Sequence, residues 1–360
     1  MFGGHFADRR VLVTGHTGFK GSWLALWLRA LGANVTGISL PPESSPNHWD
    51  ILGLDVDSHY VDIRDAESVK RVIARSNPEI VFHLAAQSLV RRSYREPVDT
   101  WSTNVIGTMN VMDACRTIDD LRAIVVITTD KCYENKEWLW GYREVDRLGG
   151  LDPYSASKAA TELAVASVRH SFYNKPGMAQ IATARAGNVI GGGDWSEDRL
   201  IPDLVRAISS GGSLEIRSPN ATRPWQHVLD CLSGYLLLAQ RMCEGGPGFD
   251  GPWNFGPDRE GNRTVEQVLI AMKNCWPRVA WNHVDVTRPH EAQLLHLDST
   301  KARDLLPWRP VYTFEEAAMQ TAHWYQRYLD EGRAASHDQL TDYSALALER
   351  GVVWAATHTI

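Results

Sequence analysis

Hydrophobic and polar positions alternate along the first half of the chain in a pattern that predicts short strands separated by helices. Apolar runs of four or five residues, typical of strands buried on both faces, are followed by longer segments with helical spacing. This order favours a doubly wound α/β fold, in which crossover helices cover a parallel sheet. Strands are predicted at residues 11–14, 35–38, 80–83, 124–128 and 181–184, and helices beginning near Gly21, Ala66, Trp101 and Tyr154.

The same pattern suggests how the chain is divided. Trp23 and Trp27 lie one helical turn apart, which indicates a packed helix face, and Gly32 is a natural helix end. After Asn188 the alternation gives way to pieces rich in Gly, Pro and Arg, which predicts a second lobe. We expect a sheet domain over residues 1–187, a smaller C-terminal lobe over residues 188–330 that is interleaved with it, and a polar, irregular, peripheral tail over residues 331–360.

The composition is that of an ordinary globular protein, with 44% hydrophobic and 22% charged residues among 360. No apolar stretch reaches the ~20 residues of a membrane helix, and the first residues lack a signal peptide's apolar core, so we expect a cytoplasmic protein. The net charge of −6 argues against nucleic acid as a partner. The five cysteines form no C-x-x-C pair and no H-E-x-x-H motif is present, so we expect packing cysteines and no metal.

Three glycines stand between the first predicted strand and its helix. Gly15, Gly18 and Gly21 form G-x-x-G-x-x-G, which suits a tight turn, close approach of a pyrophosphate and helix–strand packing. The free N–H groups of the helix N-terminus attract phosphate, so the motif predicts a dinucleotide site. No acid that would hold the 2′-hydroxyl of NAD ends the second strand. Lys20 is a candidate for a 2′-phosphate, but no arginine follows that strand, so NAD is favoured over NADP.

Tyr154 and Lys158 lie four residues apart at the start of a predicted helix and therefore share one face. We expect the ammonium of Lys158 to lower the pKa of Tyr154 and to make the phenolate a base for an alcohol. Together with the glycine motif, the pair predicts hydride transfer between an alcohol carbon and a nicotinamide. Asp62 and Ile63 are candidates for the adenine pocket, although Asp62 could instead cap a helix.

Longer motifs carry a family resemblance. GHTGFKG, HLAAQ, STNVIGT and YSASK resemble the extended short-chain dehydrogenase/reductases, and TTDKCYENKEW, RAGNVIGGGDW, EIRSPNATRPWQHV and RPHEAQLLHLD resemble the CDP-glucose 4,6-dehydratase family within them. The resemblance runs from about residue 8 to residue 328. It implies a seven-stranded Rossmann domain, a C-terminal lobe for the sugar nucleotide, and NAD that is reduced and reoxidised in one turnover. Enzymes that act on CDP-heptose share many of these motifs, so the sugar stays open.

The implied reaction converts CDP-D-glucose to CDP-4-keto-6-deoxy-D-glucose. Tyr154 removes the C4 hydroxyl proton while hydride passes from C4 to NAD, water is lost across C5 and C6, and the hydride returns to C6. Thr129 would bond the C4 oxygen, and Asp130, which must be buried to keep a proton, would protonate the leaving hydroxyl. Lys131 stands where dTDP-glucose dehydratases carry glutamate; it is assigned to elimination, as a base or as an electrostatic aid.

The resemblance also implies which residues touch the ligands. Catalysis is assigned to Thr129, Asp130, Lys131, Tyr154 and Lys158. NAD is expected to contact Gly15, Thr17, Gly18, Phe19, Lys20, Gly21, Asp62, Ile63, Leu84, Ala85, Ala86, Asn104, Thr128, Tyr154 and Lys158. The CDP-sugar is expected to contact Gln87 and Ser88 at the hexose, Asn188, Arg199, Leu200, Arg223 and Arg288 at the diphosphate, and Glu215 and Arg217 at the base, where a carboxylate can accept from the cytosine amine.

Two other functions remain open at this point. A nucleotide-sugar 4-epimerase needs no acid for elimination, so Asp130 and Lys131 speak against it, whereas a nucleotide-sensing regulator would not need the tyrosine–lysine pair. We expect His83 to be a hydrogen-bonded core residue and leave His227 and His290 open. The resemblance further implies a homodimer, or a dimer of dimers, built on the helix that carries Tyr154, and a role in deoxysugar biosynthesis for the lipopolysaccharide O-antigen.

Overall fold

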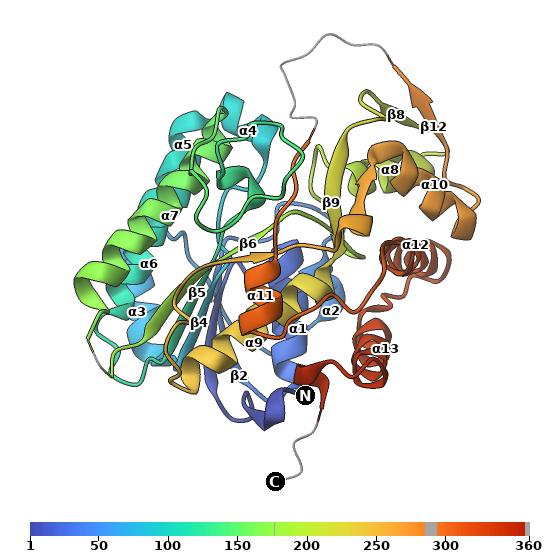
Figure 1. Cartoon of the computed structure of the whole chain (residues 1–360). Coiled ribbons are helices and arrows are strands. Elements are labelled where there is room, and N and C mark those ends of the chain that lie inside the picture. Colours follow the sequence, from blue (N-terminus) through green and yellow to red (C-terminus); the bar gives the residue numbers. More distant parts are fainter. Residues whose placement is uncertain (176, 285–293, 357–360) are drawn as a thin grey trace.

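The computed structural model describes residues 1–175, 177–284 and 294–356, and its centre is a seven-stranded parallel sheet (Figure 1). The strand order is β10-β6-β5-β4-β1-β2-β3. Every predicted strand is present, which confirms the α/β fold, but the sheet also holds two strands that have no apolar run. These strands are β1 (Arg10–Thr14), β2 (Asn34–Ser39), β3 (Asp57–Tyr60), β4 (Ile80–His83), β5 (Ala123–Ile127), β6 (Gln180–Ala186) and β10 (Gly251–Phe255).

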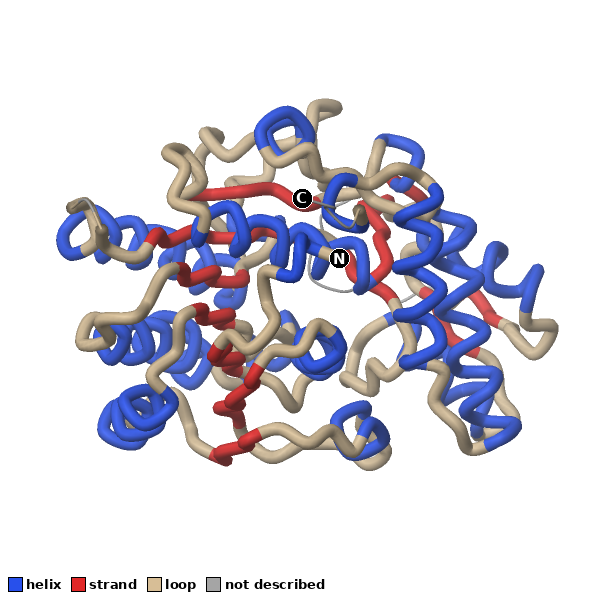
Figure 2. Tube along the Cα trace, turned by 90° about the horizontal axis from the view of Figure 1, so that it is seen from below, coloured by secondary structure: helices blue, strands red, loops and turns tan. Residues whose placement is uncertain are grey.

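Helices cover both faces of this sheet, as the view along it shows (Figure 2). Side chains of one strand alternate between two cores, so that Val11 and Val13 pack on one face and Leu12 on the other. Trp23 and Trp27 are fully buried in the first core, as expected. The first core takes α1 (Phe19–Ala30) and α9 (Val228–Cys243), and the second takes α3 (Ala66–Ser76), α6 (Thr108–Cys115) and α7 (Pro153–Phe172).

Smaller sheets and helices form the part of the molecule that follows Asn188. One sheet has the order β11-β9-β7, and the other pairs β8 with β12. Because β10 comes from this later part and yet joins the central sheet, the two parts are interleaved in the chain; the boundary at residue 188 stays a prediction. The elements are β7 (Asn188–Ile190), α8 (Leu200–Ser209), β8 (Leu214–Ile216), β9 (Thr222–His227), β11 (Asn262–Thr264), α10 (Val265–Cys275), β12 (Trp281–His283) and α11 (Thr300–Leu305).

The expectation of an irregular, peripheral tail from residue 331 is wrong. α12 (Phe314–Glu331) is followed by α13 (Ser336–Glu349), which buries Leu340 and Tyr343. Trp354 is also buried, and its ring stacks on Phe2 with the centroids 5.1 Å apart. The polar residues that suggested a tail occupy the exposed side of an amphipathic helix.

A hydrogen-bonded chain through His48 ties α13 to the first turn of α1. Trp324 Nε1 donates to Ser336 Oγ (2.8 Å), and Ser22 Oγ donates to the Phe19 carbonyl (3.0 Å). Between them, the His48 ring bonds Ser336 through Nε2 (2.8 Å) and Ser22 through Nδ1 (2.7 Å). The serine hydroxyls therefore fix a neutral histidine that donates from Nδ1 and accepts at Nε2. Burial lowers the pKa of His48 to about 3, in agreement with this state.

The remaining helices surround the carboxyl ends of the strands. The helix predicted near Trp101 begins earlier, at Pro97, and passes through a π-helical turn into α6. In the described ranges no helix has both the length and the apolar character to span a membrane, and no cluster of His, Cys, Asp or Glu is placed to hold a metal ion. The further helices are α2 (His48–Leu52), α4 (Val90–Arg95), α5 (Pro97–Trp101) and the π-helix Ser102–Gly107.

Candidate active site

A cavity of about 1700 Å³ opens at the carboxyl ends of β1, β4, β5 and β6. The chain leaves β1 toward β2 but continues from β3 to β4 on the other side of β1, so the cavity lies where the strand order switches. Ligands of open parallel sheets bind at this point. A pocket for one small ligand usually measures ~300–1000 Å³, so this cavity has room for two ligands side by side.

The glycine loop fits the pyrophosphate of a dinucleotide. Gly15 has φ +74°, and a Cβ there would lie 2.7 Å from Ala85 N; a Cβ on Gly21 would lie 2.0 Å from Gly15 O. Gly18 is different, because a Cβ there would meet its nearest chain atom at 3.4 Å, an ordinary contact. No side chain caps α1 at Gly18, so the first N–H groups of the helix are free for an anion.

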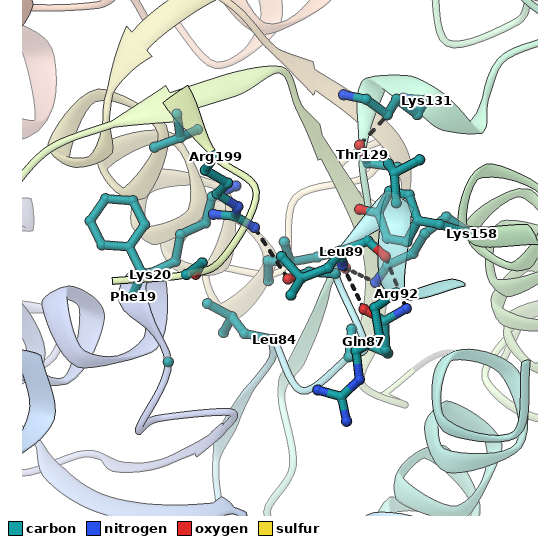
Figure 3. A pocket seen from close by; sticks show the side chains of 18 of the residues that line it. Phe19, Lys20, Leu84, Gln87, Leu89, Arg92, Thr129, Lys131, Lys158 and Arg199 are labelled. Atoms are coloured by element: carbon teal, nitrogen blue, oxygen red, sulfur yellow. Dashed lines mark hydrogen bonds between the residues drawn. The ribbon is translucent and has the colours of Figure 1, made fainter. Parts of the chain in front are cut away.

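Lys20 does not point toward the end of β2, so the expectation that it approaches a 2′-phosphate is wrong. Its ammonium lies 6.0 Å from the centre of the Tyr235 ring, within electrostatic range of Arg199 and Asp130. Figure 3 shows Lys20 on the same side of the cavity as Arg199. Burial, followed by the charge of Arg199, lowers the pKa of Lys20.

Asp62 and Ile63 line the cavity beyond β2 and β3. Asp62 binds Arg64 Nη2 at 2.6 Å, and this hydrogen bond lowers the pKa of the carboxyl. The alternative that Asp62 caps a helix is wrong, because Asp65 caps α3 by accepting from Ser68 N. Both residues reach the cavity wall, but both oxygens of Asp62 accept from Arg64 and the Ile63 side chain is buried in the second core.

Tyr154 and Lys158 both come from α7, whose start is fixed by Pro153 and by Asp152 accepting from Ser155 N. The ammonium of Lys158 donates to the Ile127 carbonyl at 3.2 Å. Burial raises the pKa of Tyr154 to about 12, although a hydrogen bond with Thr129 acts in the opposite direction. The expected lowering by Lys158 is therefore wrong for the protein alone. Desolvation lowers the pKa of Lys158 to about 8.

The segment Thr129 to Lys131 follows β5 and brings an acid and an amine together. The Asp130 side chain is 0% exposed, so the expected burial is confirmed. Its Oδ1 accepts from Thr129 Oγ1 at 3.1 Å and from the Lys131 ammonium at 3.5 Å. Its Oδ2 has no hydrogen-bond partner within the part of the chain that the structure describes. Lys131 lines the cavity and Asp130 lies directly behind it, so the pair keeps unused hydrogen-bonding capacity beside Tyr154.

An ion pair behind the cavity was not predicted. Glu162 accepts from Arg185 through both of its oxygens, at 2.9 and 2.8 Å, and both side chains are buried. Thr183 donates to the same carboxylate at 2.7 Å, and Thr128 also donates to it. Glu162 lies one turn after Lys158 on the same helix face, so this spacing in the sequence was a signal that could have revealed it.

Asn104 also lies behind the cavity wall, not on it. Its amide accepts from Gln87 N at 2.8 Å and donates to the Gln87 carbonyl (3.0 Å) and to Ser157 Oγ (2.9 Å). The Gln87 side chain is likewise engaged, by Leu89 and Thr100. Both predicted contact residues therefore position the loop after β4. Asn104, Glu162 and Arg185, together with Gln87 and Thr128, which also line the cavity, are called the support layer below.

The predicted substrate residues divide into two groups. Arg199 pairs with Asp194 at 3.2 Å and donates to Ser88 Oγ at 3.2 Å, on the wall of the cavity. Glu215 is exposed in the middle of β8, and neither it nor Arg217 lines the cavity. Arg288 and His290 lie outside the described residues. The predicted residues that do line the cavity include Thr17, Phe19, Leu84, Ala85, Ala86, Thr128, Asn188, Leu200 and Arg223.

Two histidines are accounted for by the fold. His83 is buried and bonds Thr14 at 2.7 Å and Thr108 at 2.9 Å, so the prediction of a hydrogen-bonded core residue is confirmed. His227 is buried at the start of α9, where it accepts from Leu229 N at 3.3 Å. Neither of these rings lines the cavity.

Comparison with known proteins gives matches over most of the chain. Residues 11–254 match the NAD dependent epimerase/dehydratase family. The CDP-glucose 4,6-dehydratase of Salmonella typhimurium is 45% identical, covering 93% of this chain and 96% of its own. The dTDP-glucose 4,6-dehydratase of Xanthomonas campestris is 29% identical, covering 87% and 92%. The UDP-glucose 4-epimerase of Thermus thermophilus, solved in complex with NAD, has the same fold, with a TM-score of 0.75 at 24% identity, covering 88% and 98%.

Proposed function

Because this chain belongs to the NAD dependent epimerase/dehydratase family, we propose that it is a CDP-glucose 4,6-dehydratase. It converts CDP-D-glucose to CDP-4-keto-6-deoxy-D-glucose and water, with no net change of the bound NAD. The observation that carries the proposal is that Lys131 lines the cavity together with Tyr154, while the buried Asp130 bonds Lys131 and lies within electrostatic range of Tyr154. Oxidation and reduction at C4 alone need a base, whereas loss of water also needs a proton donor and help at C5.

Tyr154 takes the proton of the C4 hydroxyl in the first step. Bound NAD supplies a hydride acceptor at C4 and later a hydride donor at C6. In the protein alone burial raises the pKa of Tyr154 to about 12, so proton removal depends on the hydrogen bond with Thr129 and on positive charge nearby, both of which lower that pKa. Arg199 contributes such charge.

Asp130 and Lys131 act in the second step. The 4-keto group makes the C5 proton acidic, and the C6 hydroxyl leaves as water once it has received a proton. Asp130 Oδ2, buried and without a partner, suits the proton donor. Lys131, which is partly exposed to the cavity, assists removal of the C5 proton as a base or by its charge. The hydride then returns to C6 and the ketone remains at C4.

The glycine loop and Asp62 are proposed to bind NAD, and Arg199 and Arg223 the diphosphate. Arg199 can exchange its present contacts to Asp194 and Ser88 for phosphate oxygens, to which a guanidinium fork is well matched. The assignment of glucose is supported by the 45% identity to the Salmonella enzyme. A different CDP-sugar, such as a CDP-heptose, is the alternative within the same chemistry.

A homodimer through α5 and α7 is part of the proposal. Val98 is 80% exposed and Leu163 62% exposed on these helices, and Ile106 on the π-helix is 55% exposed. Apolar side chains that gather on neighbouring helices mark an interaction surface. The O-antigen pathway, a cytoplasmic location and a dimer of dimers stay predictions.

The test is incubation with CDP-glucose and NAD, followed by mass spectrometry. We expect the sugar nucleotide to lose the mass of one water. An unchanged mass with a new C4 epimer would make the protein a 4-epimerase, the function of the structurally similar Thermus enzyme. CDP-heptose in place of CDP-glucose tests the alternative substrate in the same assay.

A further inference from the structure

Lys20 is a lysine inside the nucleotide loop whose ammonium has no hydrogen-bond or ion-pair partner among the described residues. It is the second residue of α1, directly before Gly21, and its side chain lines the cavity. No ion pair or hydrogen bond joins its ammonium to any group in residues 1–175, 177–284 or 294–356. The nearest ring is Tyr235, 6.0 Å away, at the outer limit of a cation–π contact.

In the described part of the chain, three cations and one carboxylate lie within electrostatic range of Lys20, together with the Cys231 thiol, which raises its pKa. Arg199 and Lys131 both lower its pKa, after the larger effect of burial, and Lys158 is within electrostatic range. Asp130 is the carboxylate among its electrostatic neighbours, and its Oδ1 already accepts from Lys131. An enclosed ammonium without a carboxylate of its own costs stability, and a Met or Leu side chain would pack there without that cost.

Lys20 stands between the two parts of the predicted ligand site. Its backbone belongs to the glycine loop, which fits the pyrophosphate, and its charge reaches Lys158, the partner of the base. The nicotinamide must lie between these two places, because it is joined to the pyrophosphate and must meet the carbon whose hydroxyl Tyr154 deprotonates. A cation beside a ring that changes from positive to neutral favours the neutral form.

We propose that Lys20 is a third lysine of the reaction centre, whose charge favours transfer of hydride onto the bound cofactor at the expense of the stability of the ligand-free protein. In that transfer the C4–H bond breaks, its electron pair goes to the nicotinamide, and the hydroxyl proton goes to Tyr154. Lys20 takes no part in bond making. The inference deepens the proposed function but applies to any oxidation by NAD in this cavity.

The experiment compares the binding of NAD and of NADH to the protein and to Lys20→Met, without a sugar nucleotide. In Lys20→Met we expect the preference for NADH over NAD to fall about tenfold, the effect of one pKa unit of differential interaction. We also expect the melting temperature of the ligand-free variant to rise, because the unpaired charge is gone. Lys70→Met, on the exposed face of α3, is the matched control and leaves the ratio of affinities unchanged.

Each other outcome overturns the proposal. If the affinities for NAD and for NADH fell equally, Lys20 would only contact the pyrophosphate. If neither affinity changed, Lys20 would have no role in binding. A lower melting temperature in Lys20→Met would show that the charge is paired. Lys20→Gln, which keeps a polar side chain, repeats the test if the methionine variant does not fold. No dehydration is measured, so a failure here is distinct from a failure of the proposed reaction.

Discussion

The reaction centre and the support layer differ in how far the chain itself satisfies the hydrogen-bonding capacity of their polar groups. In the support layer, Glu162 takes two bonds from Arg185 and further bonds from Thr128 and Thr183, and the amide of Asn104 uses its oxygen and both hydrogens. In the reaction centre, Asp130 Oδ2 and the Lys20 ammonium have no hydrogen-bond partner among the described residues.

The difference separates positioning from chemistry. A group whose hydrogen bonds are all made by the chain is held in place and has little capacity for a ligand, whereas a group left with free capacity can act on one. On this view, changes in the support layer should first reduce stability, and changes in the reaction centre should first reduce rates.

Arg185→Leu should have the largest effect on stability. It leaves the buried Glu162 carboxylate without its cation, which costs about 3–5 kcal/mol in the free energy of unfolding. Chemical denaturation measures this loss, and Arg185→Leu with Glu162→Leu should recover most of it. Arg241→Leu, which breaks an exposed pair with Glu244 on α9, should cost less than about 1 kcal/mol. If both arginine variants lost the same free energy of unfolding, the buried ion pair of the support layer would stabilise the protein no more than an exposed one.

Tyr154→Phe should have the largest effect on rate. Without the phenol, the proton of the C4 hydroxyl has no acceptor. Reduction of NAD on mixing with CDP-glucose should therefore slow ~100-fold or more, while the melting temperature changes little. The absorbance of NADH in a single turnover measures the rate. Reduction at the wild-type rate would remove Tyr154 from the mechanism.

Asp130→Asn and Lys131→Ala should act only after the first oxidation. Both variants should form NADH normally and then lose water ~10- to 100-fold more slowly, because the acid or the amine is missing. Enzyme-bound NADH and a 4-keto hexose should therefore accumulate. For Lys131→Ala, exchange of solvent deuterium into C5 separates the two roles: it falls with dehydration if Lys131 is the base and persists if Lys131 acts by charge. Dehydration at the normal rate in both variants would contradict their assignment.

A fall in pH should lower the free energy of unfolding through the buried histidines, and this is the smallest of the expected effects. Burial lowers the pKa of both His48 and His83 to about 3 in the folded protein. Below pH 6.5 the unfolded chain binds protons that the folded one does not, so stability is lost as the pH falls from about 6.5 toward 3. Between pH 7 and 6 each histidine should contribute less than about 1 kcal/mol. His83→Gln should flatten the dependence of melting temperature on pH, whereas exposed His323→Gln should not.

The sequence was informative where one property decides the structure. Apolar runs located β1, β4 and β5, and the glycines located the loop, because burial on both faces and close backbone approach each restrict residue types strongly. The edge strand β3, Asp57–Tyr60, escaped prediction because it is polar and partly exposed. α13 was missed because the polar residues of its exposed face obscure, in the sequence, the buried Leu340 and Tyr343.

Predictions at the site failed where the result depends on several neighbours at once. The spacing of Tyr154 and Lys158 correctly put them on one helix, but the pKa of Tyr154 is set chiefly by burial, which spacing does not reveal. Asn104 has a side chain suited to a ligand, and only the three-dimensional contacts show that it binds the backbone of Gln87. The direction of Lys20 is likewise a property of the packed structure.

The chain of hydrogen bonds through His48 has a consequence for how the protein is made. The carbonyl of Phe19, in the first turn of α1, is held by Ser22, and Ser22 is held through His48 by Ser336. Synthesis proceeds from the N-terminus, so residues 15–21 leave the ribosome more than 300 residues before this last partner. The nucleotide loop thus acquires its final set of bonds only after Ser336 has been synthesised, and a nascent chain stopped short of α13 lacks the bond from Ser336 to His48.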